Sequence, residues 1–173
     1  MATLIYLSLN LGGIIMFKRG KKELILEGVS IIFKNLEGRG DRFNRAGNRN
    51  FSVLIDDPIT ALRLQAQGWN VKSSKPKNPD DRVYWYLPVT VNLSGNTKVY
   101  LVTDQCILLK EDDVYLVDEM ELSHADLILR AYDWEVNGKH GRKAYLNTGY
   151  FVARIDRFAS KYQGMGDGNG DMF

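Results

Sequence analysis

The order of apolar and polar positions along the 173-residue chain indicates short β-strands rather than helices. Apolar residues recur at every second position over short runs, and Gly, Asn, Asp and Pro separate these runs. Many short strands in a chain of this size favour one small β-barrel. Strands are predicted at residues 24–33, 50–55, 69–72, 83–93, 98–103, 126–136 and 143–155.

One helix is predicted between Asp57 and Gly68, and we expect it to cap one end of the barrel. Asp57 can accept hydrogen bonds from free backbone N–H groups, Pro58 suits the first helical position, and apolar residues with helical spacing follow. A further helical turn is possible in the acidic residues 111–121, but their mixed pattern does not decide it. Hairpin turns are predicted at residues 94–96 and 137–138, where Gly and Asn tolerate a positive φ.

Strand alternation divides residues 83–93 into two faces. Tyr84 and Tyr86 stand on one face, and rings at this spacing can stack on successive bases; the alternative is two ordinary surface tyrosines. The other face is apolar throughout and is expected to point into the core; its residues are Val83, Trp85, Leu87, Val89, Val91 and Leu93.

The same alternation in residues 126–136 places Arg130, Tyr132 and Trp134 on one face. This face is poorly suited to a core, because each polar head would need a buried partner. It suits a stacking platform that also contacts phosphate. The hairpin that follows adds three further candidate cations, Lys139, Arg142 and Lys143.

The most basic segment covers residues 38–51 and contains one acidic residue, Asp41. It cannot be buried, so it is predicted to form an exposed loop, which is either a phosphate-binding loop or an ordinary charged one. Cations on three separate loops, with aromatic residues on the strands between them, are typical of a single-stranded nucleic-acid groove. The loops contribute the candidates Arg39, Arg42, Phe43, Arg45, Arg49, Lys72, Lys75 and Lys77.

The charge is unevenly divided along the chain. Residues 1–110 hold 16 Lys and Arg against 9 Asp and Glu, whereas residues 111–173 hold 7 against 12. A basic body with an acidic end is expected of a protein that binds a polyanion. The single Cys and the two His lack metal-ligand spacing, and no Gly-rich phosphate loop is present. We therefore predict no metal site, no cofactor and no enzymatic activity.

The two ends of the chain differ from its middle. Residues 1–15 are apolar, but they lack the basic start of a signal peptide and are too short to span a bilayer, so no membrane association is predicted. Gly12 and Gly13 lie shortly before Met16, and two glycine codons can read as a purine-rich ribosome-binding sequence. We therefore hypothesise that translation naturally starts at Met16 and that residues 1–15 are a leader. Residues 16–162 would form the domain, and residues 163–173, rich in Gly and Asp, are predicted to be a disordered tail.

Three stretches of the chain resemble a family of bacteriophage single-stranded DNA-binding proteins. They are LEGVSIIFKNLEGRGDRFNRAGNRNFSVLID, GWNVK and YDWEVNGKHGRKAYL, and the likeness extends over residues 26–162. The resemblance covers a loop from Phe43 to Phe51 and a hairpin from Trp134 to Leu146. It implies a mainly β, OB-like barrel that coats and protects single strands during phage DNA replication, recombination or repair. The cytoplasm of the bacterial host cell is the expected location.

The C-terminal tail is similar to the acidic tails with which single-strand-binding proteins recruit replication and recombination enzymes. The residues implied in partner binding are Asp167, Asp171, Met172 and Phe173. Two other functions stay open. An RNA-binding module would use the same physics, because no residue pattern reveals a contact to a 2′-hydroxyl. A structural or assembly protein of a phage particle would use the aromatic face as a protein interface.

Overall fold

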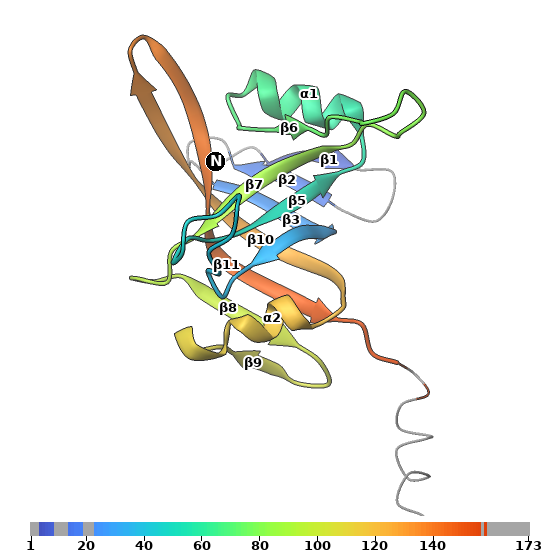
Figure 1. Cartoon of the computed structure of the whole chain (residues 1–173), viewed down its shortest axis with the longest axis vertical. Helices are drawn as coiled ribbons and strands as arrows, with labels where there is room; N and C mark the ends of the chain where they lie inside the picture. Colours follow the sequence, from blue (N-terminus) through green and yellow to red (C-terminus); the bar gives the residue numbers. More distant parts are fainter. Residues whose placement is uncertain (1–3, 9–13, 19–22, 157, 159–173) are drawn as a thin grey trace, which may run out of the picture.

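The residues that the structure describes form one sheet of eleven strands with two short helices (Figure 1). The computed structural model describes residues 4–8, 14–18, 23–156 and 158. Its elements are β1 (Leu4–Ser8), β2 (Ile14–Lys18), β3 (Glu23–Val29), β4 (Ile31–Asn35), β5 (Arg49–Ile55), α1 (Pro58–Ala66), β6 (Lys72–Ser73), β7 (Trp85–Val91), β8 (Lys98–Val102), β9 (Cys106–Leu108), a 3-10 turn (Glu111–Asp113), α2 (Tyr115–Glu119), β10 (Leu122–Val136) and β11 (Lys139–Ala153).

One bent segment closes the sheet into a ring. Only Ser30 separates β3 from β4, and β3 pairs with β10 whereas β4 pairs with β5. The neighbour order β3–β10–β11–β7–β5–β4 therefore returns to the segment where it began (Figure 1). The pairs in this ring are antiparallel except β7 and β11, which run parallel through Ala144↔Val89 and Tyr145↔Thr90. This arrangement confirms the predicted mainly β, OB-like barrel.

The bend was not predicted, because residues 24–33 read as one continuous strand. In the structure Gly28 has a φ of 66° and Phe33 a φ of 53°, and the pairing register shifts on both sides of the bend. The backbone N–H of Leu54 donates to the carbonyl of Ser30 at 2.9 Å. The segment therefore changes partner strand without leaving a free carbonyl at its corner.

The core lies inside the ring and is apolar. Phe51 and Phe151 are fully buried, and their rings meet edge to face with centroids 5.4 Å apart. Of the predicted inward face of residues 83–93, Leu87, Val89 and Val91 are buried, and Trp85 and Leu93 pack against the core while partly exposed. Val83 was wrongly placed on this face: it precedes β7, where the pairing with β5 begins, and its side chain is 40% exposed.

Two of the described helices pack on this core: α1, which was predicted, and α2, which lies in the segment that the sequence left open. At the start of α1, Asp57 accepts hydrogen bonds from the backbone N–H groups of Ile59 (3.2 Å) and Thr60 (3.0 Å), which confirms the predicted cap. Ala61 and Leu64 join the core from α1. The acidic residues 111–121 form the 3-10 turn and α2, and α2 contributes buried Val117.

The remaining strands differ from the prediction in extent. Residues 69–72 were expected to form a strand, but Trp69 makes only an isolated bridge to Arg142, and β6 is confined to Lys72–Ser73 beside β7. Strand β9 was not predicted and pairs with β8. Strands β1 and β2 pair with each other, and β2 pairs with β3. The proposed start at Met16 and the domain limits stay predictions.

Candidate nucleic-acid interface

A row of polar and aromatic side chains crosses four strands on the outer face of the barrel. Asn50 of β5 lies opposite Thr90 of β7, Thr90 opposite Tyr145 of β11, and Tyr145 opposite Arg130 of β10. Residues directly opposite one another in neighbouring strands share one face of a sheet. The row therefore runs without interruption from the strand that follows the arginine-rich loop to the predicted stacking platform.

Two hollows follow this outer face, and together they are called the groove here. The larger, of about 760 Å³, is lined by the cations Arg49, Lys72 and Lys143 together with Asn50, Thr90 and Tyr145 and other residues. The second, of about 610 Å³, is lined among others by Lys72, Lys75, Tyr84 and Tyr86. Because Lys72 lines both hollows, they adjoin each other and mark one path over β5, β7 and the start of β11. This path unites candidate residues from all three predicted loops.

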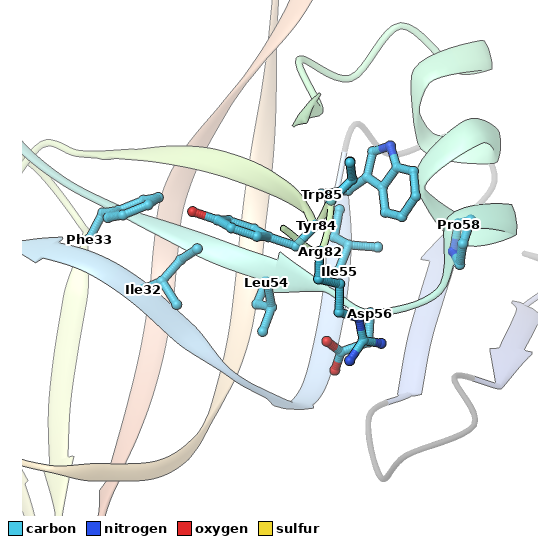
Figure 2. Close-up of a pocket in the computed structure, with 10 residues that line it drawn as sticks. Ile32, Phe33, Leu54, Ile55, Asp56, Pro58, Arg82, Tyr84 and Trp85 are labelled. Atoms are coloured by element: carbon cyan, nitrogen blue, oxygen red, sulfur yellow. The ribbon is translucent and has the colours of Figure 1, made fainter. Parts of the chain in front are cut away.

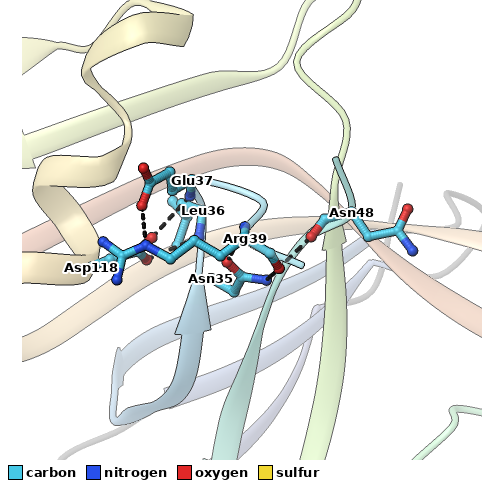
Figure 3. A network of polar contacts seen from close by, with 6 residues as sticks. All are labelled: Asn35, Leu36, Glu37, Arg39, Asn48 and Asp118. Carbon is cyan, nitrogen blue, oxygen red and sulfur yellow. Dashed lines mark hydrogen bonds and ion pairs between the residues drawn. The ribbon is translucent and has the colours of Figure 1, made fainter. Parts of the chain in front are cut away.

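The arginine-rich loop between β4 and β5 is held at its base by two side chains (Figure 3). The Asn35 amide accepts from the backbone N–H of Arg39 (2.8 Å) and donates to the carbonyl oxygens of Arg39 (3.1 Å) and Asn48 (3.4 Å), which joins the two ends of the loop. Asp118 of α2 accepts from the backbone N–H groups of Leu36 (2.9 Å) and Glu37 (2.8 Å). The acidic segment therefore fixes where the loop leaves the sheet.

The tip of the loop is ordered by Asp41, the acidic residue within it. Its carboxylate accepts from the backbone N–H groups of Phe43 and Asn44, both at 2.6 Å, and these hydrogen bonds hold the pKa of Asp41 below its ordinary value. Phe43 is 82% exposed, and the guanidinium of Arg42 lies 4.9 Å from the centre of its ring. An exposed ring beside a cation can meet a base and its phosphate together.

Arg49 lines the larger hollow, whereas the other arginines of this loop line neither hollow. One of its terminal nitrogens is 3.3 Å from a carboxylate oxygen of Glu111, and its Nε is buried without a hydrogen-bond partner. Because this Nε is closed to solvent, a phosphate would meet the guanidinium at its terminal nitrogens, where Glu111 now pairs with it. Phosphate oxygens are hydrogen-bond acceptors that match the planar, forked arrangement of N–H groups in a guanidinium.

The hairpin of β10 and β11 carries the predicted stacking platform. Tyr132 and Trp134 are 59% and 40% exposed, as expected for residues that face away from the core. Tyr132 meets Tyr145 edge to face with centroids 5.9 Å apart, and the ammonium of Lys143 lies 5.5 Å above the Tyr145 ring. Trp134 covers Gly141, where an added Cβ would lie 2.8 Å from its ring. These rings stand next to the larger hollow through Tyr145 and Lys143.

Other predicted residues are placed less directly. Arg142 lies opposite Asp133, so it faces away from Tyr132 and Trp134; it donates to Asp133 at 2.7 Å and lies 5.4 Å from the Trp69 ring. Arg39 is paired with Glu37, which raises its pKa. Arg45, Lys77 and Lys139 are exposed but line neither hollow. The DNA contacts of all the candidate residues stay predictions, and Asp167, Asp171, Met172 and Phe173 lie outside the described residues.

The structure adds three residues that the sequence reasoning missed. Asn50 and Tyr145 belong to the cross-strand row, and both strands had been predicted, so alternation from Phe51 and Ala144 could have found them. Phe33 is 58% exposed, and its ring meets that of Tyr86 edge to face at 5.5 Å. Tyr86 in turn lies 6.1 Å from Tyr84, which makes a chain of three rings. No local signal identifies Phe33, because its outward direction depends on its unusual φ.

The barrel and its groove of cations and aromatic rings define an OB-like nucleic-acid-binding protein. A sequence model of the family described as "Putative phage ssDNA-binding domain" matches residues 15–173. The chain therefore belongs to this family of phage single-stranded DNA-binding proteins, as the resemblance in its motifs implied. Membership of a family of binding proteins agrees with the expectation that the chain is not an enzyme. Comparison with curated protein sequences found no significant match.

Solved structures of the single-stranded DNA-binding protein from bacteriophage Enc34 share the fold. One has a TM-score of 0.53 at 12% identity and covers 98% of this chain and 96% of its own. Another, in complex with ssDNA, has a TM-score of 0.54 at 10% identity, with coverage of 90% and 98%. At such identities the likeness concerns the fold. Among the described residues, no helix is long and apolar enough to cross a membrane.

Proposed function

We propose that the groove binds one strand of DNA without strong sequence preference. Arg49, Lys72 and Lys143 contact phosphates, and Tyr84, Tyr86 and Tyr132 stack on bases. The observation that carries this proposal is that the two hollows adjoin at Lys72, with cations and aromatic side chains in the lining of both. Stacking on aromatic side chains does not depend on which base is present, because every base has a π-face.

A single strand suits this groove better than a duplex. The bases of a duplex are stacked on each other and present only their edges, whereas the rings of Tyr132 and Phe43 are exposed and need the face of a base. The described helices α1 and α2 lack the cations of a recognition helix apart from Arg63. The Enc34 protein, whose fold is similar, has been solved in complex with ssDNA, which supports the same ligand here.

The biological role follows from binding of this kind. A protein that covers the phosphates and stacks the bases of a single strand protects it from cleavage and from pairing. We infer that the chain coats single strands in phage DNA replication, recombination or repair, in the cytoplasm of the bacterial host cell. The tail residues Asp167, Asp171, Met172 and Phe173 would recruit an enzyme of these processes, because a terminal aromatic residue with its carboxylate can fill a pocket lined by cations.

A competition experiment tests the proposed ligand. Fluorescence anisotropy would measure binding of a labelled oligo(dT) to the full chain, with unlabelled single-stranded DNA, duplex DNA and RNA as competitors, over a range of salt concentrations. We expect single-stranded DNA to compete best and the affinity to fall steeply with salt, since phosphate contacts release counterions. Equal competition by RNA would favour the RNA-binding alternative. Binding that does not change with salt, or no binding, would overturn the proposal and favour a structural protein.

A pair of variants tests the location. Lys72→Ala removes the cation shared by both hollows, and Lys98→Ala removes a cation at the start of β8, which lines neither hollow. The first variant should weaken binding and reduce the salt dependence, while the second should leave both close to those of the natural chain. Equal effects of the two variants would place the DNA elsewhere.

A further inference from the structure

Beyond the groove, a third hollow of about 480 Å³ opens next to Phe33 (Figure 2). Ile32, Phe33 and Leu54 line it from β4 and β5, and Arg82, Val83 and Tyr84 line it from the segment before β7. Its walls are mainly apolar side chains, which is usual for pockets that take flat organic groups. Tyr84 also lines the second hollow of the groove, so this space lies directly beside the path over the barrel.

The chain of aromatic rings leads in the same direction. Tyr84 and Tyr86 have centroids 6.1 Å apart, and Tyr86 and Phe33 5.5 Å. Figure 2 shows the ring of Tyr84 directed toward Phe33, whereas Trp85 points away toward α1. A base that leaves the stack at Tyr86 would therefore meet Phe33 and the apolar wall next.

Phe33 is held in this position against its backbone preference. A φ of 53° is uncommon for a residue with a bulky side chain, and such backbone strain persists where the surrounding structure imposes it, most often at ligand sites. The strain does not serve to bury the ring in the core, because 58% of Phe33 is exposed. It instead brings the ring to the rim of the hollow.

We propose that this hollow is a pocket for one nucleobase at the end of the DNA strand's path, with Phe33 as a stacking wall and Arg82 beside the adjoining phosphate. This inference rests on the proposed function and adds a binding subsite to it. The occupant is a base rather than a protein side chain, because the hollow adjoins the groove at Tyr84 and is likewise lined by aromatic rings and a cation, Arg82. The carboxylate of Asp56 is also in its lining.

Terminal abasic sites test the pocket. In the shortest oligo(dT) that retains full affinity the strand cannot slide, so each base has one place on the protein. We expect removal of the base at one end to weaken binding to the full chain about fivefold or more, the lower limit for one base stacked on an aromatic side chain. Removal of the base at the opposite end should have a smaller effect.

Two variants show whether this loss arises at the hollow. Val83→Trp fills the space from an exposed position outside the strands, and Phe33→Ala removes the wall. In both, the intact oligonucleotide should bind about as weakly as the abasic one binds the natural chain, and the abasic site should cost less than twofold. Ile59→Trp, a similar change on the exposed surface of α1, should behave like the natural chain.

The outcomes separate this inference from the proposed function. If the intact oligonucleotide binds but neither end shows a loss, or if the loss is unchanged in both Val83→Trp and Phe33→Ala, the pocket is wrong and the groove stands. If Lys72→Ala has no effect on binding, the location of the groove itself is wrong. Binding of the abasic oligonucleotide by each variant, at the affinity of the natural chain, verifies that the variant is folded.

Discussion

Arg49 and Glu111 lie 3.3 Å apart where the arginine-rich loop returns to the sheet, and both line the larger hollow of the groove. The carboxylate of Glu111 stands beside a guanidinium that has an unpartnered, buried Nε. In a groove for DNA, a carboxylate at this place competes with phosphate for the same cation. Glu111 of the acidic segment therefore weakens the contact that Arg49 can make with phosphate.

Replacement of this carboxylate should strengthen DNA binding. In Glu111→Gln we expect about two- to fivefold tighter binding of oligo(dT), since pairs of this exposure contribute up to about 1 kcal/mol. The plot of log affinity against log salt should become steeper by up to about 0.7, the contribution of one phosphate contact to a single strand. Fluorescence anisotropy at several salt concentrations measures both. Glu121→Gln is the control, because Glu121 pairs with Arg154 at 2.8 Å and lines neither hollow; weaker binding in Glu111→Gln would contradict this reading.

Tyr132 should contribute to binding without contributing to folding. Its ring is 59% exposed and contacts Tyr145 at its edge, so Tyr132→Ala should reduce the affinity for single-stranded DNA about five- to tenfold, as expected for loss of one stacked base. The thermal unfolding midpoint should change little. Tyr150→Ala offers a matched comparison, because Tyr150 stacks on Tyr100 at 4.5 Å where β11 pairs with β8, apart from the groove. An equal loss in both variants would argue against a stacking role for Tyr132.

Asp118 should affect DNA binding from outside the groove. It accepts hydrogen bonds from Leu36 and Glu37, and Asp118→Ala would release the start of the arginine-rich loop. Ordering the loop on binding would then cost about 1 kcal/mol more, a loss of about fivefold in affinity. Hydrogen exchange of residues 36–48 should become faster in the free protein. Asp112→Ala, in the neighbouring 3-10 turn, should leave the hydrogen exchange and the affinity unchanged. If exchange in Asp118→Ala stays as slow as in the natural chain, the hydrogen bonds to Asp118 are not needed to hold the loop.

The cap of α1 leads to a prediction about stability and pH. Hydrogen bonds to Asp57, above all from the Thr60 hydroxyl, lower its pKa from the ordinary 3.8 in the folded chain. A lowered folded pKa means that the stabilisation is present above pH 3.8 and is lost as the pH falls through the folded value. Asp57→Ala should lower the free energy of unfolding by about 1 kcal/mol at neutral pH and by less in acid. Urea unfolding at pH 7 and pH 3 measures this, with Asp56→Ala as control.

The faces of individual strands could be predicted from the sequence, because alternation is a local property of the backbone. It correctly separated buried Leu127 and Leu129 from exposed Tyr132 and Trp134. The cap at Asp57 was predictable for the same reason, since the cap and the N–H groups that it satisfies lie within three residues.

Features that depend on pairing across the sheet could not be predicted. The unusual φ of Phe33 falls where the register of β4 against β5 shifts, shortly after the bend at Ser30, and this pairing with β5 is not visible in the sequence. The position of Arg142 opposite Asp133 needs the register of the hairpin. A shift of register beyond Leu129 and Leu146 also changes which residues of β11 face outward, so one alternation does not hold for the whole strand.

The bend has a consequence for how the barrel assembles. Its two halves are joined at Ser30 by the chain itself, so the first and last strands of the ring need no ladder of hydrogen bonds between them. Strand β3 pairs with β10, which lies about a hundred residues later in the chain, so this part of the ring needs a long-range contact to form during folding. The ring is therefore closed by one covalent link, and cleavage of the chain at Ser30 would open it between β3 and β4 without removing a strand pair.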